Sequence, residues 1–203
     1  MRLCRYMRVK PWLVRSWFGI PRLNPAQFVW YEVAGDGSCF FHSLLAACNT
    51  GGYRTQKVKT QQEWALRLRR NFAGKYDRKF HDEVSDDDDE EYDEVRKKMG
   101  QLKEWATEPM ILFTMRYKNM SLAIYDVKNR RLVSRIWPED FMTRKCVLIL
   151  WVNHEHFEVL LFRHPVRKVL RGFLDPADEV DRWLMEHMYK AWSDGGPGRE
   201  VAH

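Results

Sequence analysis

Cys39 is the residue in this sequence best placed to act as a nucleophile. The run Phe28 to Val33 is aromatic and β-branched and predicts a strand, and residues 34–38 predict a tight turn after it. The apolar residues that follow recur at helical spacing: Phe40, Phe41, Leu44, Leu45 and Cys48. Cys39 therefore starts a helix, where free amide N–H groups and the helix dipole favour a thiolate over a thiol. The same N–H groups, on Gly37, Ser38 and Cys39, could hold an oxyanion. A cysteine that only fills the core beside two phenylalanines is the alternative.

His156 is the candidate general base. It begins an apolar strand directly after a turn, 117 positions beyond Cys39. Side chains alternate along a strand, so His156 and Glu158 share a face, and Glu158 could accept a hydrogen bond from the ring and fix its tautomer. His154, on the turn itself, is a rival base. The alternative is that neither residue is catalytic: His156 would be a structural histidine and Glu158 a surface glutamate.

The elements around these residues predict an α+β protein. An amphipathic helix is expected over residues 61–72, with Trp64, Leu68 and Phe72 on its apolar side and arginines on the other. Further helices are expected along 95–105 and from Pro109, and strands at 121–127, 131–137, 146–152 and 156–162. Residues 146–152 are continuously apolar, which is typical of a strand covered on both faces. Helices first and paired strands later favour an α+β architecture.

Composition limits the class of protein. The chain has 203 residues and is 45% hydrophobic, which suits one domain with a substantial core. We expect a soluble intracellular protein, cytoplasmic or nuclear, because the sequence has neither a membrane-spanning apolar run nor a signal peptide. The four cysteines, at positions 4, 39, 48 and 146, lack CxxC spacing, so neither a zinc site nor a disulfide framework is predicted.

Charge is unevenly distributed along the chain. The formal net charge is +6, although residues 82–94 contain ten acidic residues in thirteen. Residues 1–25 are basic and interrupted by prolines, and we interpret them as an extension to a core at 26–163. Residues 164–203 form a second extension with a predicted helix at 176–192. The basic stretches and their aromatics could bind nucleic acid or an anionic membrane, but no recognition motif for nucleic acid is present.

Two motifs resemble those of the ovarian-tumour (OTU) family of cysteine proteases. Residues 36–41 (Asp-Gly-Ser-Cys-Phe-Phe) resemble the family's Asp-Gly-x-Cys-hydrophobic-Phe signature, and residues 156–160 (His-Phe-Glu-Val-Leu) resemble its His-aromatic strand. Trp105 before a helix, followed by the strand SLAIYDV, resembles the family's central block. The resemblance runs from about Phe28 to Phe162.

The resemblance implies an OTU-like fold, with a central mixed or antiparallel sheet flanked by helices. It implies a deubiquitinase that hydrolyses bonds to the C-terminal glycine of ubiquitin or a ubiquitin-like protein, without a metal or cofactor. Cys39 matches the nucleophile and His156 the general base. Asp36 matches the acidic loop residue that shapes the oxyanion hole or supports the histidine. Trp151 and Phe157 could wall a narrow channel for the Gly-Gly tail. We expect the protein to act as a monomer.

Two departures from the family pattern leave alternatives open. Glu158 stands where the family usually has Asp or Asn, so either Glu158 or Asp36 could orient His156. Residues 74–94 look like an acidic insertion, either a solvated loop or a segment that steers the arginines of the ubiquitin tail. Competing hypotheses are a catalytically inactive OTU-like module that binds ubiquitin, and a basic interaction protein recruited through its tails. A compact OTU-like domain with unusual tails would also suit a virus or pathogen acting on host ubiquitin.

Overall fold

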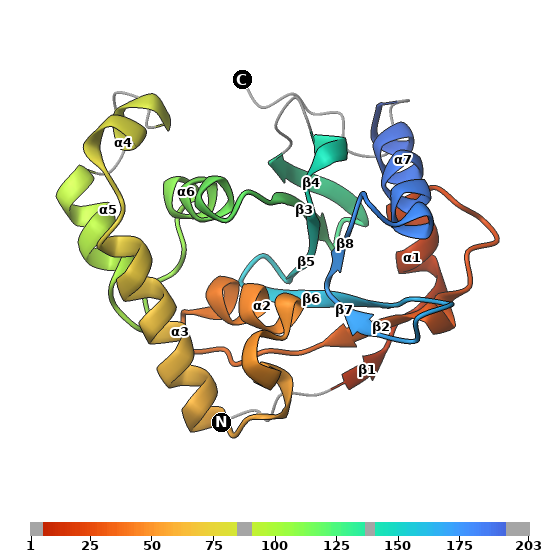
Figure 1. Ribbon diagram of the computed structural model, residues 1–203, viewed down its shortest axis with the longest axis horizontal. Coiled ribbons are helices and arrows are strands. Elements are labelled where there is room, and N and C mark those ends of the chain that lie inside the picture. Colours follow the sequence, from red (N-terminus) through yellow and green to blue (C-terminus); the bar gives the residue numbers. More distant parts are fainter. Residues whose placement is uncertain (1–5, 85–90, 137–140, 194–203) are drawn as a thin grey trace.

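The computed structural model describes residues 6–84, 91–136 and 141–193 (Figure 1). Its strands are β1 (Tyr6–Arg8), β2 (Phe28–Tyr31), β3 (Ser121–Asp126), β4 (Arg131–Ile136), β5 (Cys146–Val152), β6 (His156–Arg163), β7 (Leu170–Arg171) and β8 (Phe173–Leu174). Its α-helices are α1 (Pro11–Phe18), α2 (Cys39–Cys48), α3 (Val58–Ala73), α4 (Arg78–Val84), α5 (Tyr92–Met99), α6 (Glu108–Lys118) and α7 (Glu179–Ser193). Short 3₁₀ segments occupy Pro25–Gln27, Thr50–Thr55 and Phe141–Thr143.

One mixed sheet organises the molecule. Its strand order is β1-β2-β6-β5-β3-β4, with β7 paired to β6 and β8 to β5. Only the β3–β5 pairing is parallel among the described strands. The predicted α+β class is therefore confirmed, and the strands expected at 146–152 and 156–162 form the centre of the sheet.

Both faces of the sheet are buried, which explains the continuous apolar character of its central strands. Along β3, Leu122 and Ile124 belong to one hydrophobic cluster, while Ala123 and Tyr125 belong to a second. Helices α2, α3, α5 and α6 contribute to the first cluster, and α1 and α7 contribute to the second. Figure 1 shows α1 and α7 side by side, on the other side of the sheet from α2.

The described parts of the two segments interpreted as extensions, residues 6–25 and 164–193, belong to this folded unit. Strand β1 pairs with β2, and α1 buries Leu13, Val14, Trp17 and Phe18 against the second face. Pro11 occupies the first turn of α1, where the missing N–H costs nothing, so this proline begins a helix and does not interrupt one. At the other end of the chain, α7 lies over the same face. Removing either end would uncover the sheet.

Helix α3 is rotated relative to the sequence-based expectation. Its fully buried positions are Gln61, Ala65, Arg69 and Phe72, while Trp64 and Leu68 are only half-buried. The prediction that all its arginines lie on the solvent side is therefore wrong for Arg69, which is 0% exposed. Polar contacts with the next segment hold it there, as described below.

The helix expected along 95–105 ends at Met99, where Gly100 caps it. Within the acidic run, α4 ends at Val84 and α5 begins at Tyr92. Residues 85–90 lie outside the described residues, so the role predicted for the run remains a prediction. Among the described residues, every helix is too short or too polar to traverse a lipid bilayer.

Candidate active site

The loop before Cys39 is held by a side chain that precedes it. The Ser38 N–H donates to Asp36 Oδ1 at 3.1 Å, and Gly37 adopts a φ of +83°. A short acceptor side chain followed by a left-handed glycine is a compact way to turn a strand into a helix. Cys39 is the first residue of α2, as predicted. Because the Ser38 N–H is already bonded, the predicted oxyanion donors reduce to those of Gly37 and Cys39.

Cys39 is buried, with 3% of its surface exposed. Burial raises the pKa of the thiol to about 11, although N–H groups of Phe157, Phe40 and Cys39 itself act in the opposite direction. The prediction that the helix start makes a thiolate is therefore wrong for this state, because the loss of water outweighs the local dipoles. The thiol is protonated at neutral pH. The contribution from Phe157 also places the sulfur beside the backbone at the start of β6.

His156 and Glu158 share one face of β6, as strand periodicity predicted. His156 Nε2 lies 3.5 Å from Glu158 Oε1, and the Trp30 indole N–H donates to Glu158 Oε2. Burial lowers the pKa of His156. A hydrogen bond with the Val33 backbone acts to raise this pKa but does not offset the effect of burial. The ring is therefore neutral at pH 7 and able to accept a proton.

The other edge of the His156 ring faces the loop that leads to Cys39. A β-carbon added to Gly35 would lie 3.9 Å from His156 Nδ1, so the ring packs against this loop. In the described residues, Cys39 Sγ and His156 make no hydrogen bond with each other. The candidate nucleophile and base therefore both lie at the loop before α2, but the Cys39 sulfur and the His156 ring are not in hydrogen-bonding contact in this state.

The hydrogen bonds of Asp36 go to the loop, to His42 and to Gln62, and its charge acts on His156 only as a longer-range attraction that raises the histidine pKa. Both of its carboxylate oxygens lie 3.1 Å from His42 Nε2, and Gln62 donates to Oδ2 at 3.1 Å. Burial alone would raise the pKa of Asp36, but hydrogen bonds from His42, Ser38 and Gln62 lower it overall, so the carboxylate stays ionised. Of the two acids proposed to orient His156, Glu158 lies 3.5 Å from the ring nitrogen Nε2, and which of them orients the base remains a prediction.

His42 is a buried residue of the site that the sequence analysis did not identify. It lies on α2, one turn after Cys39, and its Nδ1 contacts the Tyr53 hydroxyl while Nε2 faces Asp36. Its spacing of three residues from Cys39 was the available signal, because that spacing puts both residues on one side of a helix.

His154, the rival base, has a different environment. Its Nε2 lies 2.9 Å from Asp126 Oδ2, and its ring stacks on Trp151 at 4.7 Å between centroids. Asp126 also receives hydrogen bonds from the backbone and side chain of Asn129. These contacts explain His154 as part of the turn between β5 and β6.

The two predicted channel residues face each other across the β5–β6 pairing. Trp151 is the register partner of Phe157, and both are half-buried. Phe157 also packs edge-on against Phe40, the residue that follows Cys39, with 6.0 Å between ring centroids. Their role as channel walls remains a prediction.

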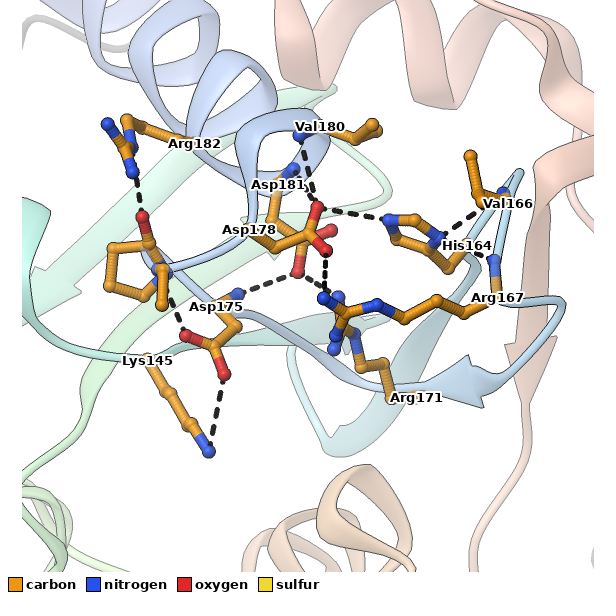
Figure 2. A network of polar contacts seen from close by, with 12 residues as sticks. Lys145, His164, Val166, Arg167, Arg171, Asp175, Asp178, Val180, Asp181 and Arg182 are labelled. Carbon is orange, nitrogen blue, oxygen red and sulfur yellow. Dashed lines mark hydrogen bonds and ion pairs between the residues drawn. The ribbon is translucent and has the colours of Figure 1, made fainter.

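A buried cluster at the opposite end of β6 has the residue types of a metal site. His164, Asp178 and Asp181 are within ligand range of one another (Figure 2). However, His164 Nδ1 accepts from the N–H groups of Val166 and Arg167, so Nε2 carries the proton that it donates to Asp178, 3.0 Å away. A nitrogen that carries a proton cannot bind a metal.

Arginines neutralise the two acids of this cluster. Arg167 lies 3.1 Å from Asp178 Oδ2, and Arg171 pairs with Asp181 (Figure 2). The Asp178 carboxylate also accepts from the N–H groups of Val180 and Asp181 in the first turn of α7. The cluster therefore anchors the start of α7 and does not fit a cation.

Comparisons with known proteins support the fold. No protein-family model matches the chain, and no curated protein matches it. Among solved structures, the chain is similar to the OTU domain of OTUD1, with 16% identity, 74% of this chain and 96% of that chain covered, and a TM-score of 0.50. It is also similar to an ovarian tumor (OTU) domain in complex with ubiquitin, with 15% identity, 83% and 90% coverage, and a TM-score of 0.52. The chain has the fold of OTU domains, a class of α+β domain.

Proposed function

We propose that this chain is a cysteine-type deubiquitinase, with Cys39 as nucleophile, His156 as general base and Glu158 as the acid that orients the base. The observation that carries the proposal is the convergence of two segments on one loop. The sulfur of Cys39 lies by the Phe157 N–H at the start of β6, and the His156 ring packs against Gly35. The OTU fold, including a structural neighbour in complex with ubiquitin, supports ubiquitin or a ubiquitin-like protein as substrate.

The residues suit acyl transfer from the terminal glycine of ubiquitin. His156 Nδ1 takes the thiol proton as the Cys39 sulfur attacks the glycine carbonyl carbon. N–H groups of Gly37 and Cys39 stabilise the oxyanion. The histidine then gives the proton to the leaving amine, and a thioester remains. Water, deprotonated by His156, hydrolyses the thioester and returns the free thiol. Glu158 favours the tautomer with the proton on Nε2, because its carboxylate oxygen lies 3.5 Å from that nitrogen.

The resting state constrains when the first proton moves. With the thiol pKa raised to about 11 and the pKa of His156 lowered, the neutral pair is favoured over the ion pair before substrate arrives. The thiolate therefore forms only after the His156 ring and the sulfur come into hydrogen-bonding contact. Binding of the ubiquitin tail between the loop and β6 supplies the energy for this step.

Labelling with a ubiquitin probe tests the function. Wild-type protein should form a covalent adduct with ubiquitin that carries a thiol-reactive group at its C-terminus, and peptide mapping should locate the adduct on Cys39. The Cys39→Ala and His156→Ala variants should not react, and both should keep their folded circular dichroism spectra. An adduct that forms equally well without His156 would contradict the assigned base.

A ubiquitin-binding module without catalysis is the second candidate, and the closed site favours it. Cys39 is 3% exposed and has no hydrogen bond to His156 in the described residues. This candidate predicts that ubiquitin binds, as measured by calorimetry or NMR titration, while the probe leaves Cys39 unlabelled. Recruitment through free tails has less support, because described parts of both ends pack on the sheet.

A further inference from the structure

Arg69 is the largest side chain among those fully buried in the described residues. It comes from α3, and its guanidinium donates in three directions. Nε donates to the Met99 carbonyl at 3.0 Å, Nη1 to the Glu104 carbonyl at 2.8 Å, and Nη2 to the Lys98 carbonyl at 2.6 Å. Nη1 also reaches the Ser38 hydroxyl at 3.3 Å. Four hydrogen bonds thus connect one side chain to two separate segments.

The electrostatics of this contact are unusual for a buried cation. Its four hydrogen bonds all go to uncharged oxygens, and its flat face lies over the Phe41 ring at 4.6 Å. Lys98 and Met99 are the last residues of α5, so their carbonyls form the negative end of that helix. Burial lowers the pKa of Arg69 to about 10, which leaves it charged at neutral pH. Burying an arginine without a bonded carboxylate destabilises the fold unless its planar set of N–H donors is fully hydrogen-bonded.

The segment that Arg69 holds lies directly against the loop of the nucleophile. A β-carbon added to Gly37 would come within 2.3 Å of the Lys103 carbonyl carbon and 2.4 Å of its oxygen. Lys103 itself has a φ of +69°, an uncommon conformation for a residue with a side chain. The backbone of Lys103 therefore packs directly against Gly37. Arg69 holds this segment in place through its hydrogen bonds to the Glu104 and Met99 carbonyls.

We propose that Arg69 is a positioning residue that sets the orientation of the Gly37–Ser38–Cys39 backbone. It acts by clamping residues 98–104 against Gly37 and by holding the Ser38 side chain. This inference rests on the proposed function, and it adds a residue outside the Cys-His-acid set. The N–H groups that receive the oxyanion must be fixed before reaction for their dipoles to be effective. The clamp supplies that fixed backbone without touching the substrate.

The test compares Arg69→Lys with Arg67→Lys, a matched change at an exposed position on the same helix. Lysine keeps the charge but cannot bond to three carbonyls in one plane. For Arg69→Lys, kcat for cleavage of a ubiquitin C-terminal ester should fall roughly 10- to 100-fold, because small misplacements of catalytic groups cost about that much. The affinity for ubiquitin, measured in a Cys39→Ala background, should change less than about twofold, since the binding surface is untouched.

Hydrogen exchange supplies a readout that does not need activity. The Ser38 N–H and the Gln101 N–H, which donates to the Lys98 carbonyl, report on the two clamped segments. In Arg69→Lys both should exchange on the order of tenfold faster, while amides of β5 and β6 keep their protection. The Arg67→Lys control should match wild type in every measurement.

Two results would overturn the inference. One is an Arg69→Lys protein with wild-type kcat and wild-type exchange at Ser38 and Gln101. The other is faster exchange throughout β5 and β6, which would mean that Arg69 only stabilises the whole fold. If wild-type protein cleaves no ubiquitin substrate, the proposed function fails, and the exchange measurement still decides whether Arg69 positions the loop.

Discussion

The buried state of Cys39 predicts an unusual pH dependence for its chemistry. A pKa of about 11, compared with the ordinary 9.0, corresponds to about 3 kcal/mol against the thiolate. At pH 7, about one molecule in ten thousand would carry the thiolate, compared with about one in a hundred for an unperturbed thiol. The free protein should therefore be a poor target for small alkylating reagents at neutral pH, even though its proposed reaction uses this sulfur.

Alkylation with iodoacetamide, followed by mass spectrometry of the Cys39 peptide, measures this property. The rate should rise tenfold for each pH unit between about pH 7 and pH 10 without reaching a plateau, because only the thiolate reacts. In protein unfolded by guanidinium, the alkylation rate of the same peptide should reach half its maximum near pH 9 and level off above it, which supplies the reference. A plateau below pH 8.5 in the folded protein would refute the reasoning, because the helix start would then outweigh burial.

Three further predictions concern the base, its rival and the ends of the chain. Replacing the acid that faces the base, Glu158→Gln, should lower kcat roughly 100-fold with little change in ubiquitin affinity, measured by steady-state kinetics and calorimetry. His154→Ala should leave kcat within about twofold of wild type in the same assay, because its partners belong to the β5–β6 turn. Deleting residues 1–25 should unfold the protein, as judged by circular dichroism and gel filtration. The four buried side chains of α1 stabilise the fold by roughly 1.5–3 kcal/mol each, a sum comparable to a typical domain's whole stability.

Local patterns predicted some parts of this molecule well. The helix start at Cys39 follows from a glycine turn and apolar spacing, and the shared face of His156 and Glu158 follows from a period of two. These are properties of neighbours in the chain. The burial of Cys39 could not be predicted in this way, because Phe157, whose backbone lies beside the sulfur, comes from a strand more than a hundred residues away.

Other sequence-based predictions were wrong because the same residue type has two uses. Prolines interrupt helices but also begin them, and Pro11 begins α1. Arginines on an amphipathic helix usually face solvent, but Arg69 faces inward because carbonyls at the end of α5 and in the following loop accept its N–H groups. Those acceptors are backbone atoms, and sequence carries little information about where backbone atoms meet.

The second face of the sheet is closed by helices from the two ends of the chain, α1 and α7. During synthesis, α7 emerges from the ribosome after the central strands and long after α1. Until then the apolar side chains of β3, β5 and β6 on this face lack the cover that α7 supplies. A nascent chain stalled before residue 179 should therefore bind chaperones strongly. A protein tag joined close to the end of α7 should lower the yield of folded protein more than one joined through a long linker.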